Sequence, residues 1–250
     1  MPQTERATWG FRLAPRRWPS LFRAVRETPD DVAVGAEVFF AVGGHDEGPA
    51  YRRFMRDPLG QQLVQEKIQY PELFMDLEQL RKLPDDTLGR EYARQLDERD
   101  IDPKKLAALT EPCYEGIDFS PDHAYVRDRV RHAHDVIHTL TDAGVDLVGE
   151  VAVAGFTFGQ TGNKGWAMLV LLNVLTGLLV GRIDSAVLAF KGYVRGRRAR
   201  LIPAAHDWER LLRLPIEDAR TELGITPFER YRPLYLDDVF ANAPKAASRP

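Results

Sequence analysis

Residues 121–144 read PDHAYVRDRVRHAHDVIHTLTDAG, and this stretch predicts one long helix that ends at Gly144. Ser120 can cap its first turn, with Pro121 at the first helical position, where a missing N–H costs nothing. At about 100° per residue, the side chains form two adjacent faces. The polar face holds His123, Arg127, Arg131, His134 and His138, and the apolar face holds Val126, Val130, Ala133, Ile137 and Leu140. We expect the apolar face to lie in the core.

The polar face carries a candidate metal site. His134 and His138 are four residues apart, so their imidazoles project one turn apart and can bind one ion. Asp135 lies about 60° round the helix from His138, as a third ligand or as an acceptor that orients the imidazoles. The alternative is a surface patch whose HDxxH spacing is incidental. Imidazole and carboxylate ligands suit Zn²⁺, but they suit Fe²⁺, Mn²⁺ or Co²⁺ equally well, so these ligands do not decide the identity of the metal. Zinc peptidases have a glutamate where Asp135 stands, which argues against peptidase chemistry.

Glu150 can complete this site only if the chain turns back. On a continuous helix, the twelve residues that separate it from His138 would span roughly 18 Å at about 1.5 Å each. Gly144 offers a break, and an antiparallel helix that starts near Val145 would return Glu150 to the level of His138. Two histidines and two carboxylates would then meet across a helical hairpin.

Start and stop signals along the rest of the chain predict an all-α fold. Thr28-Pro29-Asp30-Asp31 and Asp57-Pro58 each place a capping side chain before a proline. Gly43-Gly44 and Gly224 follow apolar periodic stretches, as glycines at helix ends do. Sustained alternation with a period of two residues, the mark of strands, is nearly absent.

Length and composition favour a single folded domain. The chain has 250 residues, of which 44% are hydrophobic and 28% charged, enough for a core. Its one cysteine, Cys113, excludes an intramolecular disulfide and fits a reducing compartment. We expect one multi-helix, bundle-like domain over residues 1–240, which includes a basic, aromatic arm at 1–19, and a disordered tail at 241–250.

Three stretches bear on contact with a membrane, and two of them are basic enough to suit an anionic surface. The first 26 residues hold six arginines and one acid, interleaved with aromatic side chains. They lack the apolar core of a secretory signal, so a non-secreted chain is expected. Residues 165–181 are uncharged, and their length favours a buried or half-inserted helix over a membrane span. Residues 191–200 carry five positive charges and no acid. The alternative is a packed terminal arm for the first stretch, a core helix for residues 165–181 and a solvated loop for residues 191–200.

Several motifs resemble one known family. His134, Asp135, His138 and Glu150 reproduce the HDxxH and downstream glutamate of the coenzyme Q biosynthesis protein 4 family, with no gap in the spacing. Further likeness lies in Leu83-Pro84 with Leu88-Gly89-Arg90-Glu91-Tyr92, Gly149-Glu150-Val151, Gln160-Thr161-Gly162, Trp208-Glu209 and Glu222-Leu223-Gly224-Ile225. The resemblance covers roughly residues 20 to 225. It departs from the family at Val130, where the family often has an aromatic residue.

The resemblance implies an all-helical protein of ubiquinone biosynthesis with a divalent metal, most simply zinc, bound by His134, Asp135, His138 and Glu150. It implies oxidative decarboxylation, in which a hydroxyl replaces the C1 carboxyl of a polyprenylated 4-hydroxybenzoate. Arg131, one turn before His134, is then a candidate for binding that carboxylate, unless it forms an ion pair with Asp128. The alternatives are a non-catalytic scaffold that binds prenyl lipid, and a metal-dependent hydrolase of prenyl phosphates.

The resemblance also implies partners and a location. The expected partners are the prenylated quinone precursor, other ubiquinone-biosynthesis proteins and the membrane surface. A homodimer stays open, and nucleic acid is not expected. The expected location is peripheral, on the cytoplasmic face of a bacterial inner membrane or the matrix face of a mitochondrial one.

Overall fold

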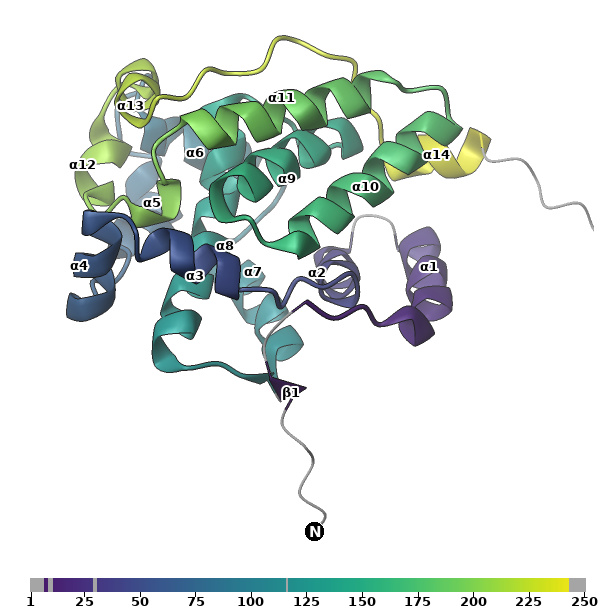
Figure 1. The fold of residues 1–250 in the computed structure, drawn as a ribbon. Helices are drawn as coiled ribbons and strands as arrows, with labels where there is room; N and C mark the ends of the chain where they lie inside the picture. The colour runs from purple at the N-terminus through teal and green to yellow at the C-terminus, as the bar shows by residue number, and fades with distance from the viewer. Residues whose placement is uncertain (1–6, 9–10, 29–30, 116, 243–250) are drawn as a thin grey trace, which may run out of the picture.

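The computed structural model describes residues 7–8, 11–28, 31–115 and 117–242, and this part of the chain is almost wholly helical (Figure 1). Its α-helices are α1 (Trp18–Glu27), α2 (Val32–Ala41), α3 (Gly48–Phe54), α4 (Pro58–Glu66), α5 (Leu77–Leu80), α6 (Leu88–Asp97), α7 (Pro103–Thr110), α8 (Pro121–Thr141), α9 (Leu147–Thr161), α10 (Lys164–Leu179), α11 (Asp184–Arg198), α12 (Trp208–Arg213), α13 (Ile216–Leu223) and α14 (Leu236–Asn242). The short 3-10 helices are η1 (Pro15–Arg17), η2 (Glu72–Met75), η3 (Glu111–Tyr114) and η4 (Ile202–Ala204). Two strands, β1 (Ala7–Thr8) and β2 (Ile117–Asp118), pair in parallel. The predicted all-α class is confirmed.

Helix α9 lies inside the molecule and is buried along almost its whole length. Its main neighbour is α11, and glycines on both helices let the two backbones approach closely. A Cβ on Gly192 of α11 would overlap the carbonyl oxygen of Ala152 in α9. A Cβ on Gly155 of α9 would likewise overlap the carbonyl oxygen of Ala189. The position of α9 therefore depends on small residues at this crossing.

The segment Gln160-Thr161-Gly162 ends α9 and ties it to the far end of α11. The Gln160 amide donates to the carbonyls of Gly196 (2.7 Å) and Arg200 (3.0 Å) and accepts from the N–H of Ile202 (2.7 Å). Gly162 stops the helix in the left-handed conformation, with φ of +72°. The buried amide is thus fully bonded, which is what its burial requires.

Helix α8 presents its apolar face to the core, as its sequence pattern predicts. Ala133, Ile137 and Leu140 join the main core, whose largest fully buried side chains include Trp208, Tyr92, Phe74 and Phe156. Val126 and Val130 pack in a second, smaller core with Phe54 and Leu63. One face of α8 is thereby fixed, and its polar face is left beside the first turn of α9.

The predicted helix starts are confirmed at two sites and displaced at a third. Asp57 caps α4 by accepting from the N–H groups of Leu59 (2.9 Å) and Gly60 (3.3 Å). Ser120 caps α8, as predicted. Helix α2 begins later than its first capping signal, at Val32, because Asp31 supplies the cap.

The predicted helix ends are correct at Gly224 and wrong at Gly144. Gly224 ends α13 in the left-handed conformation. Helix α8 stops at Thr141, because Asp142 takes up the left-handed conformation with φ of +56°. Aspartate tolerates this conformation better than most residues, so a glycine is not needed there.

Helix α10 is not buried, although it contains most of the long uncharged, apolar stretch at residues 165–181. Leu171, Leu172, Leu175, Leu178 and Leu179 are all substantially exposed, and Leu179 is 86% exposed. Within the ranges described above, no helix combines the length and hydropathy that a membrane span requires. The stretch therefore forms an apolar surface helix.

Parts of both predicted termini lie outside the described residues. In the arm at 1–19, residues 1–6 and 9–10 are among them. In the tail, residues 243–250 are outside the described ranges, whereas Ala241 and Asn242 end α14.

The α9–α11 crossing yields a prediction about stability. Gly192→Ala should lower the free energy of unfolding by about 1–3 kcal/mol, because the new methyl group overlaps the backbone of α9. Gly35→Ala in α2 is the matched control, since nothing lies within 4 Å of a Cβ there. It should raise the same free energy by about 0.5–1 kcal/mol. Urea unfolding followed by circular dichroism measures both, and equal effects would contradict the close approach.

Candidate metal site

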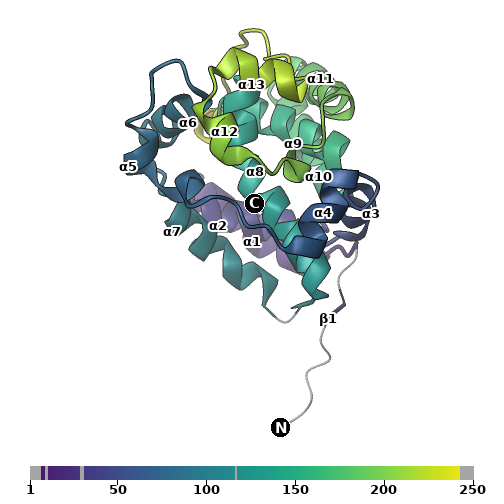
Figure 2. The same ribbon diagram turned by 90° about the vertical axis from the view of Figure 1, so that its left-hand side faces the viewer.

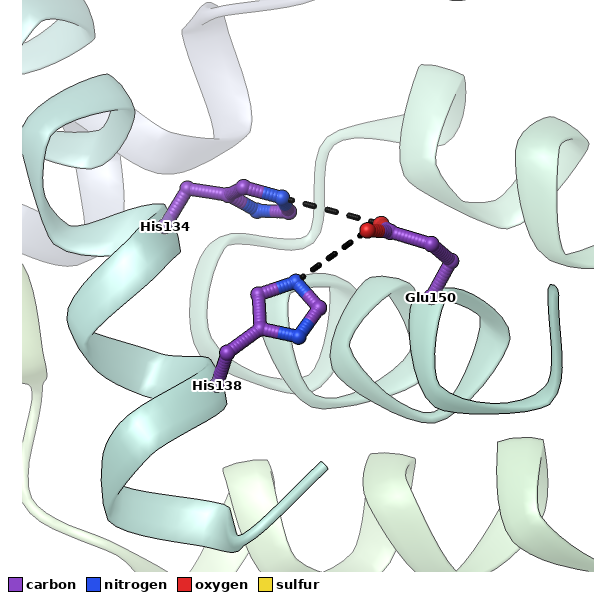
Figure 3. Close-up of side chains that lie close together, drawn as sticks. All are labelled: His134, His138 and Glu150. Atoms are coloured by element: carbon purple, nitrogen blue, oxygen red, sulfur yellow. Dashed lines mark ion pairs between the residues drawn. The ribbon is translucent and has the colours of Figure 1, made fainter. Parts of the chain in front are cut away.

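Three of the four predicted ligands come together at the junction of α8 and α9 (Figure 3). His134 and His138 project from α8, and Glu150 projects toward them from the first turn of α9. His134 Nε2 lies 3.7 Å from Glu150 Oε2, and His138 Nε2 lies 3.4 Å from Glu150 Oε1. One potential ligand atom from each residue lies within 4.8 Å of the others. The turn at residues 142–146 therefore returns Glu150 to His138, as predicted.

The spacing of these atoms fits a bound divalent ion. Two ligand atoms that each lie about 2.0–2.1 Å from a tetrahedral Zn²⁺ are about 3.3–3.4 Å apart. The 3.4 Å between His138 and Glu150 matches this edge, and it is longer than a charge-assisted hydrogen bond. His138 Nε2 is buried and has no hydrogen-bond partner, a costly state unless another group takes its lone pair. The residues present thus fit a metal ion.

His138 is oriented by the backbone of the α8–α9 turn. Its Nδ1 lies 3.2 Å from the carbonyl oxygen of Ala143 and 3.1 Å from that of Gly144. Both neighbours are acceptors, so Nδ1 must carry the proton, and Nε2 of the neutral ring keeps its lone pair. Donation from the second ring nitrogen to a carbonyl is the usual support of a metal-binding histidine. The side chain is only 1% exposed.

His134 is held mainly by ring contacts. Its imidazole stacks on Trp166 of α10, with centroids 5.5 Å apart and an interplanar angle of 18°. Trp166 in turn contacts Phe39 of α2, at 4.4 Å between centroids. The His134 Nδ1 is buried without a hydrogen-bond partner. Sequence reasoning missed Trp166, because no local motif marks a contact between α8 and α10.

The charges of the site favour a carboxylate beside protonated imidazole. Burial alone raises the pKa of Glu150, but contact with His138 and His134, together with the positive charge that either ring carries when protonated, lowers it well below its ordinary value of 4.5. Burial alone lowers the pKa of His134, but contact with Glu150 and the charges of Glu150 and Asp135 raise it above 6.5. A divalent ion would take the place of that proton.

Asp135, the fourth predicted ligand, lies outside the group of three. It follows His134 in α8 and is half-buried. Its negative charge raises the pKa of both His134 and Tyr92, so it acts on the site electrostatically.

Arg131 lies in an ion-pair network one turn before His134. Its Nη1 is 2.8 Å from Glu111 Oε2, and its Nη2 is 3.6 Å from Asp128 Oδ1. Its Nε is buried and has no hydrogen-bond partner. Arg127 pairs with Asp128 at 2.6 Å and lies over the ring of Tyr114, 4.0 Å from the centroid. The ion pair with Asp128 is therefore present, and one donor of Arg131 remains for another acceptor.

Comparison with known proteins identifies the family. Residues 49–229 match the family described as coenzyme Q (ubiquinone) biosynthesis protein Coq4. The ubiquinone biosynthesis protein COQ4 homolog of Mus musculus is 33% identical over 199 residues, which cover 75% of this chain and 70% of the mouse protein. The chain belongs to the Coq4 family. It is a protein of ubiquinone biosynthesis, and the family predicted from its motifs is confirmed.

One further relative and one solved structure are also similar to this chain. The mitochondrial COQ4 protein of Yarrowia lipolytica is 30% identical over 178 residues, which cover 69% of this chain and 64% of that protein. A crystal structure of a Nostoc punctiforme protein assigned to ubiquinone biosynthesis superposes with a TM-score of 0.64. It is 20% identical and covers 84% of this chain and 96% of its own, so it supports the helical fold.

The geometry of the site yields a prediction about metal binding. His138→Ala and Glu150→Gln should each weaken Zn²⁺ binding by more than about 100-fold, since each removes a ligand. His206→Ala, at an exposed histidine, is the control and should bind as the wild type does. Titration in competition with a chromophoric chelator measures the affinities.

The same titration, repeated at several pH values, tests whether a proton on His134 competes with the metal ion. Because a proton on His134 competes with the ion, Zn²⁺ affinity should fall as the pH is lowered through the raised pKa of His134. Equal affinity in all three variants would show that Zn²⁺ binds elsewhere on the chain.

Proposed function

We propose that this Coq4 protein catalyses the oxidative decarboxylation of a polyprenylated 4-hydroxybenzoate, with a hydroxyl replacing the C1 carboxyl. The observation that supports it is the group of His134, His138 and Glu150, whose unpartnered, buried nitrogen and 3.4 Å spacing suit a divalent ion. A bound Zn²⁺, Fe²⁺, Mn²⁺ or Co²⁺ would supply Lewis acidity, with zinc the simplest match to the ligands.

The reaction balances with dioxygen and a two-electron donor. The bond between C1 and the carboxyl carbon breaks and releases carbon dioxide, and C1 gains one oxygen atom of dioxygen as a hydroxyl. Two electrons from a reduced cofactor of the hydride or flavin class, with two protons, convert the other oxygen atom to water. The ring therefore loses its carboxyl group and gains a phenolic oxygen.

The chain's own residues have separate roles in this proposal. His134, His138 and Glu150 would hold the ion. Asp135 is kept as a fourth proposed ligand for two reasons: it belongs to the HDxxH motif of the family, and its negative charge raises the pKa of His134. Arg131 would bind the substrate carboxylate, because its buried Nε still lacks an acceptor while Glu111 occupies Nη1.

We further propose that α10 and the adjoining end of α11 lie against a membrane. The exposed leucines of α10 are continued by Ile183, Val187 and Phe190, all more than 40% exposed. Arg197, Arg198 and Arg200 are exposed at the other end of α11 and suit anionic headgroups. A peripheral location at the inner membrane, among the other ubiquinone-biosynthesis proteins, would give access to a prenylated substrate dissolved in lipid.

A metal-dependent hydrolase would need further ligands, and the other two His-Asp pairs of the sequence, His45-Asp46 and His206-Asp207, do not supply them. His45 stacks on Phe40, with 4.5 Å between centroids, and His206 is exposed. Neither joins the group of three among the residues the structure describes.

The proposed activity predicts turnover that depends on the ligands. Purified protein loaded with zinc, iron, manganese or cobalt should release carbon dioxide and hydroxylate prenylated 4-hydroxybenzoate in the presence of oxygen and a reductant. Glu150→Gln should abolish turnover but still bind the prenyl lipid, because the lipid-binding surface is elsewhere. If the lipid binds and no metal supports turnover, the protein is a scaffold and the enzymatic proposal is wrong.

The proposed membrane face predicts a loss of lipid binding on α10. The double substitution Leu175→Ser and Leu179→Ser should reduce partitioning into anionic phospholipid vesicles by about 10- to 100-fold. Leu109→Ser is the control, since Leu109 is 52% exposed on α7, on the opposite side of the molecule from α10 in Figure 2. Vesicle flotation measures both, and an equal loss in the control would contradict a specific face.

A further inference from the structure

The segment from Phe228 to Leu234, here called the C-terminal strap, crosses the turn between α8 and α9. It follows α13 and leads to α14 (Figure 1). The N–H of Phe228 donates to the carbonyl of Thr141, the last residue of α8, at 2.7 Å. The N–H of Leu147, the first residue of α9, donates to the carbonyl of Leu234 at 2.8 Å. The strap therefore bonds to both helices that carry the metal ligands.

Tyr231, in the middle of the strap, joins both sides of the turn through one hydroxyl. The Tyr231 hydroxyl accepts a hydrogen bond from the N–H of Gly144 at 2.8 Å and donates to Asp146 Oδ2 at 2.9 Å. Asp146 Oδ1 accepts from the N–H of Val148 (3.0 Å), which caps α9, and from the N–H of Leu234 (3.1 Å). Both carboxylate oxygens of this buried residue are thus occupied.

Tyr231, Gly144 and Asp146 form a hydrogen-bond network, and each end of it lies one hydrogen bond from a proposed metal ligand. The carbonyl of Gly144 accepts from His138 Nδ1, and the carbonyl of Asp146 accepts from the N–H of Glu150 at 2.8 Å. Gly149 shows how closely these groups pack, because a Cβ there would overlap the Gly144 carbonyl oxygen and the Tyr231 hydroxyl. Tyr231 is therefore linked through backbone groups of the turn to both His138 and Glu150.

We propose that Tyr231 and Asp146 are positioning residues that hold His138 and Glu150 at the spacing a divalent ion requires. This inference rests on the proposed metal site and extends it to residues that touch no ligand atom. Tyr231 lies beyond residues 49–229, the part of the chain that matches the family.

The strap is held in place by contacts along its length. Arg182 donates to the carbonyl of Pro233 at 3.1 Å and is itself held by Asp184 at 2.7 Å. Phe228 and Leu234 are buried in the main core at the two ends of the strap. The network also borders an open cavity of about 550 Å³, lined by Gly144, Asp146 and Tyr231 among others. Water from this cavity can solvate the network, so loss of the hydroxyl should affect ligand geometry more than folding.

The test compares two tyrosines of the same cavity wall. Tyr231→Phe should weaken Zn²⁺ binding by about 10- to 100-fold, the usual effect of losing support behind a ligand. It should also change the visible absorption of the Co²⁺-loaded protein, while the metal-free protein melts close to the wild type. Tyr235→Phe, at a tyrosine that is 56% exposed, should leave affinity and spectrum unchanged.

A second variant keeps the inference testable if the first disturbs folding. Asp146→Asn retains an oxygen that can cap α9, but it replaces Oδ2, which accepts from the Tyr231 hydroxyl, with an NH2 group that can only donate. It should weaken Zn²⁺ binding, and adding Tyr231→Phe should cost little more, because the residues share one network. Unchanged affinity and spectrum in Tyr231→Phe, or fully additive losses, would overturn the positioning role alone. A wild-type protein that binds neither Zn²⁺ nor Co²⁺ would overturn the metal site and this inference together.

Discussion

The close backbone packing of α9 against α11 is the constraint on which the rest of this structure depends. Glycines such as Gly155 and Gly192 let the two helices meet backbone to backbone, so α9 can lie inside the core. Glu150 sits in the first turn of that buried helix, and it can reach His138 only from there. A rigid interior helix thus carries the carboxylate that joins the two histidines of α8.

At the candidate metal site, the cost of burying polar groups is offset by interactions between their charges. A carboxylate and two imidazoles in a partly dry environment are costly unless each is paired, and one nitrogen of His138 has no hydrogen-bond partner. Without an ion, a proton shared with His134 lowers the cost, and an ion of higher charge would lower it further. The turn carbonyls behind His138 limit its ring to one useful tautomer. The same arrangement can therefore be neutralised by a proton, and it is also suited to a divalent ion.

Helix α10 connects this site with the apolar surface. Its first turn carries Trp166, which stacks on His134, while its leucines from Leu171 onward are exposed. A substrate with a charged ring and a prenyl tail has the same division into polar and apolar parts. This division suits the proposed arrangement, in which the prenyl tail would stay in the membrane while the ring reaches the group of His134, His138 and Glu150.

The sequence by itself determined the helical class, the apolar face of α8, the pairing of His134 with His138 and the return of Glu150, because each follows from local periodicity, capping or chain reach. It misplaced the end of α8 by assigning it to Gly144, since aspartate can adopt the left-handed conformation that glycine favours. Tertiary structure alone decided that the leucines of α10 face outward, that Trp166 covers His134 and that Tyr231 holds the turn. These contacts join residues far apart in sequence, and no local pattern encodes which distant surface a side chain will meet.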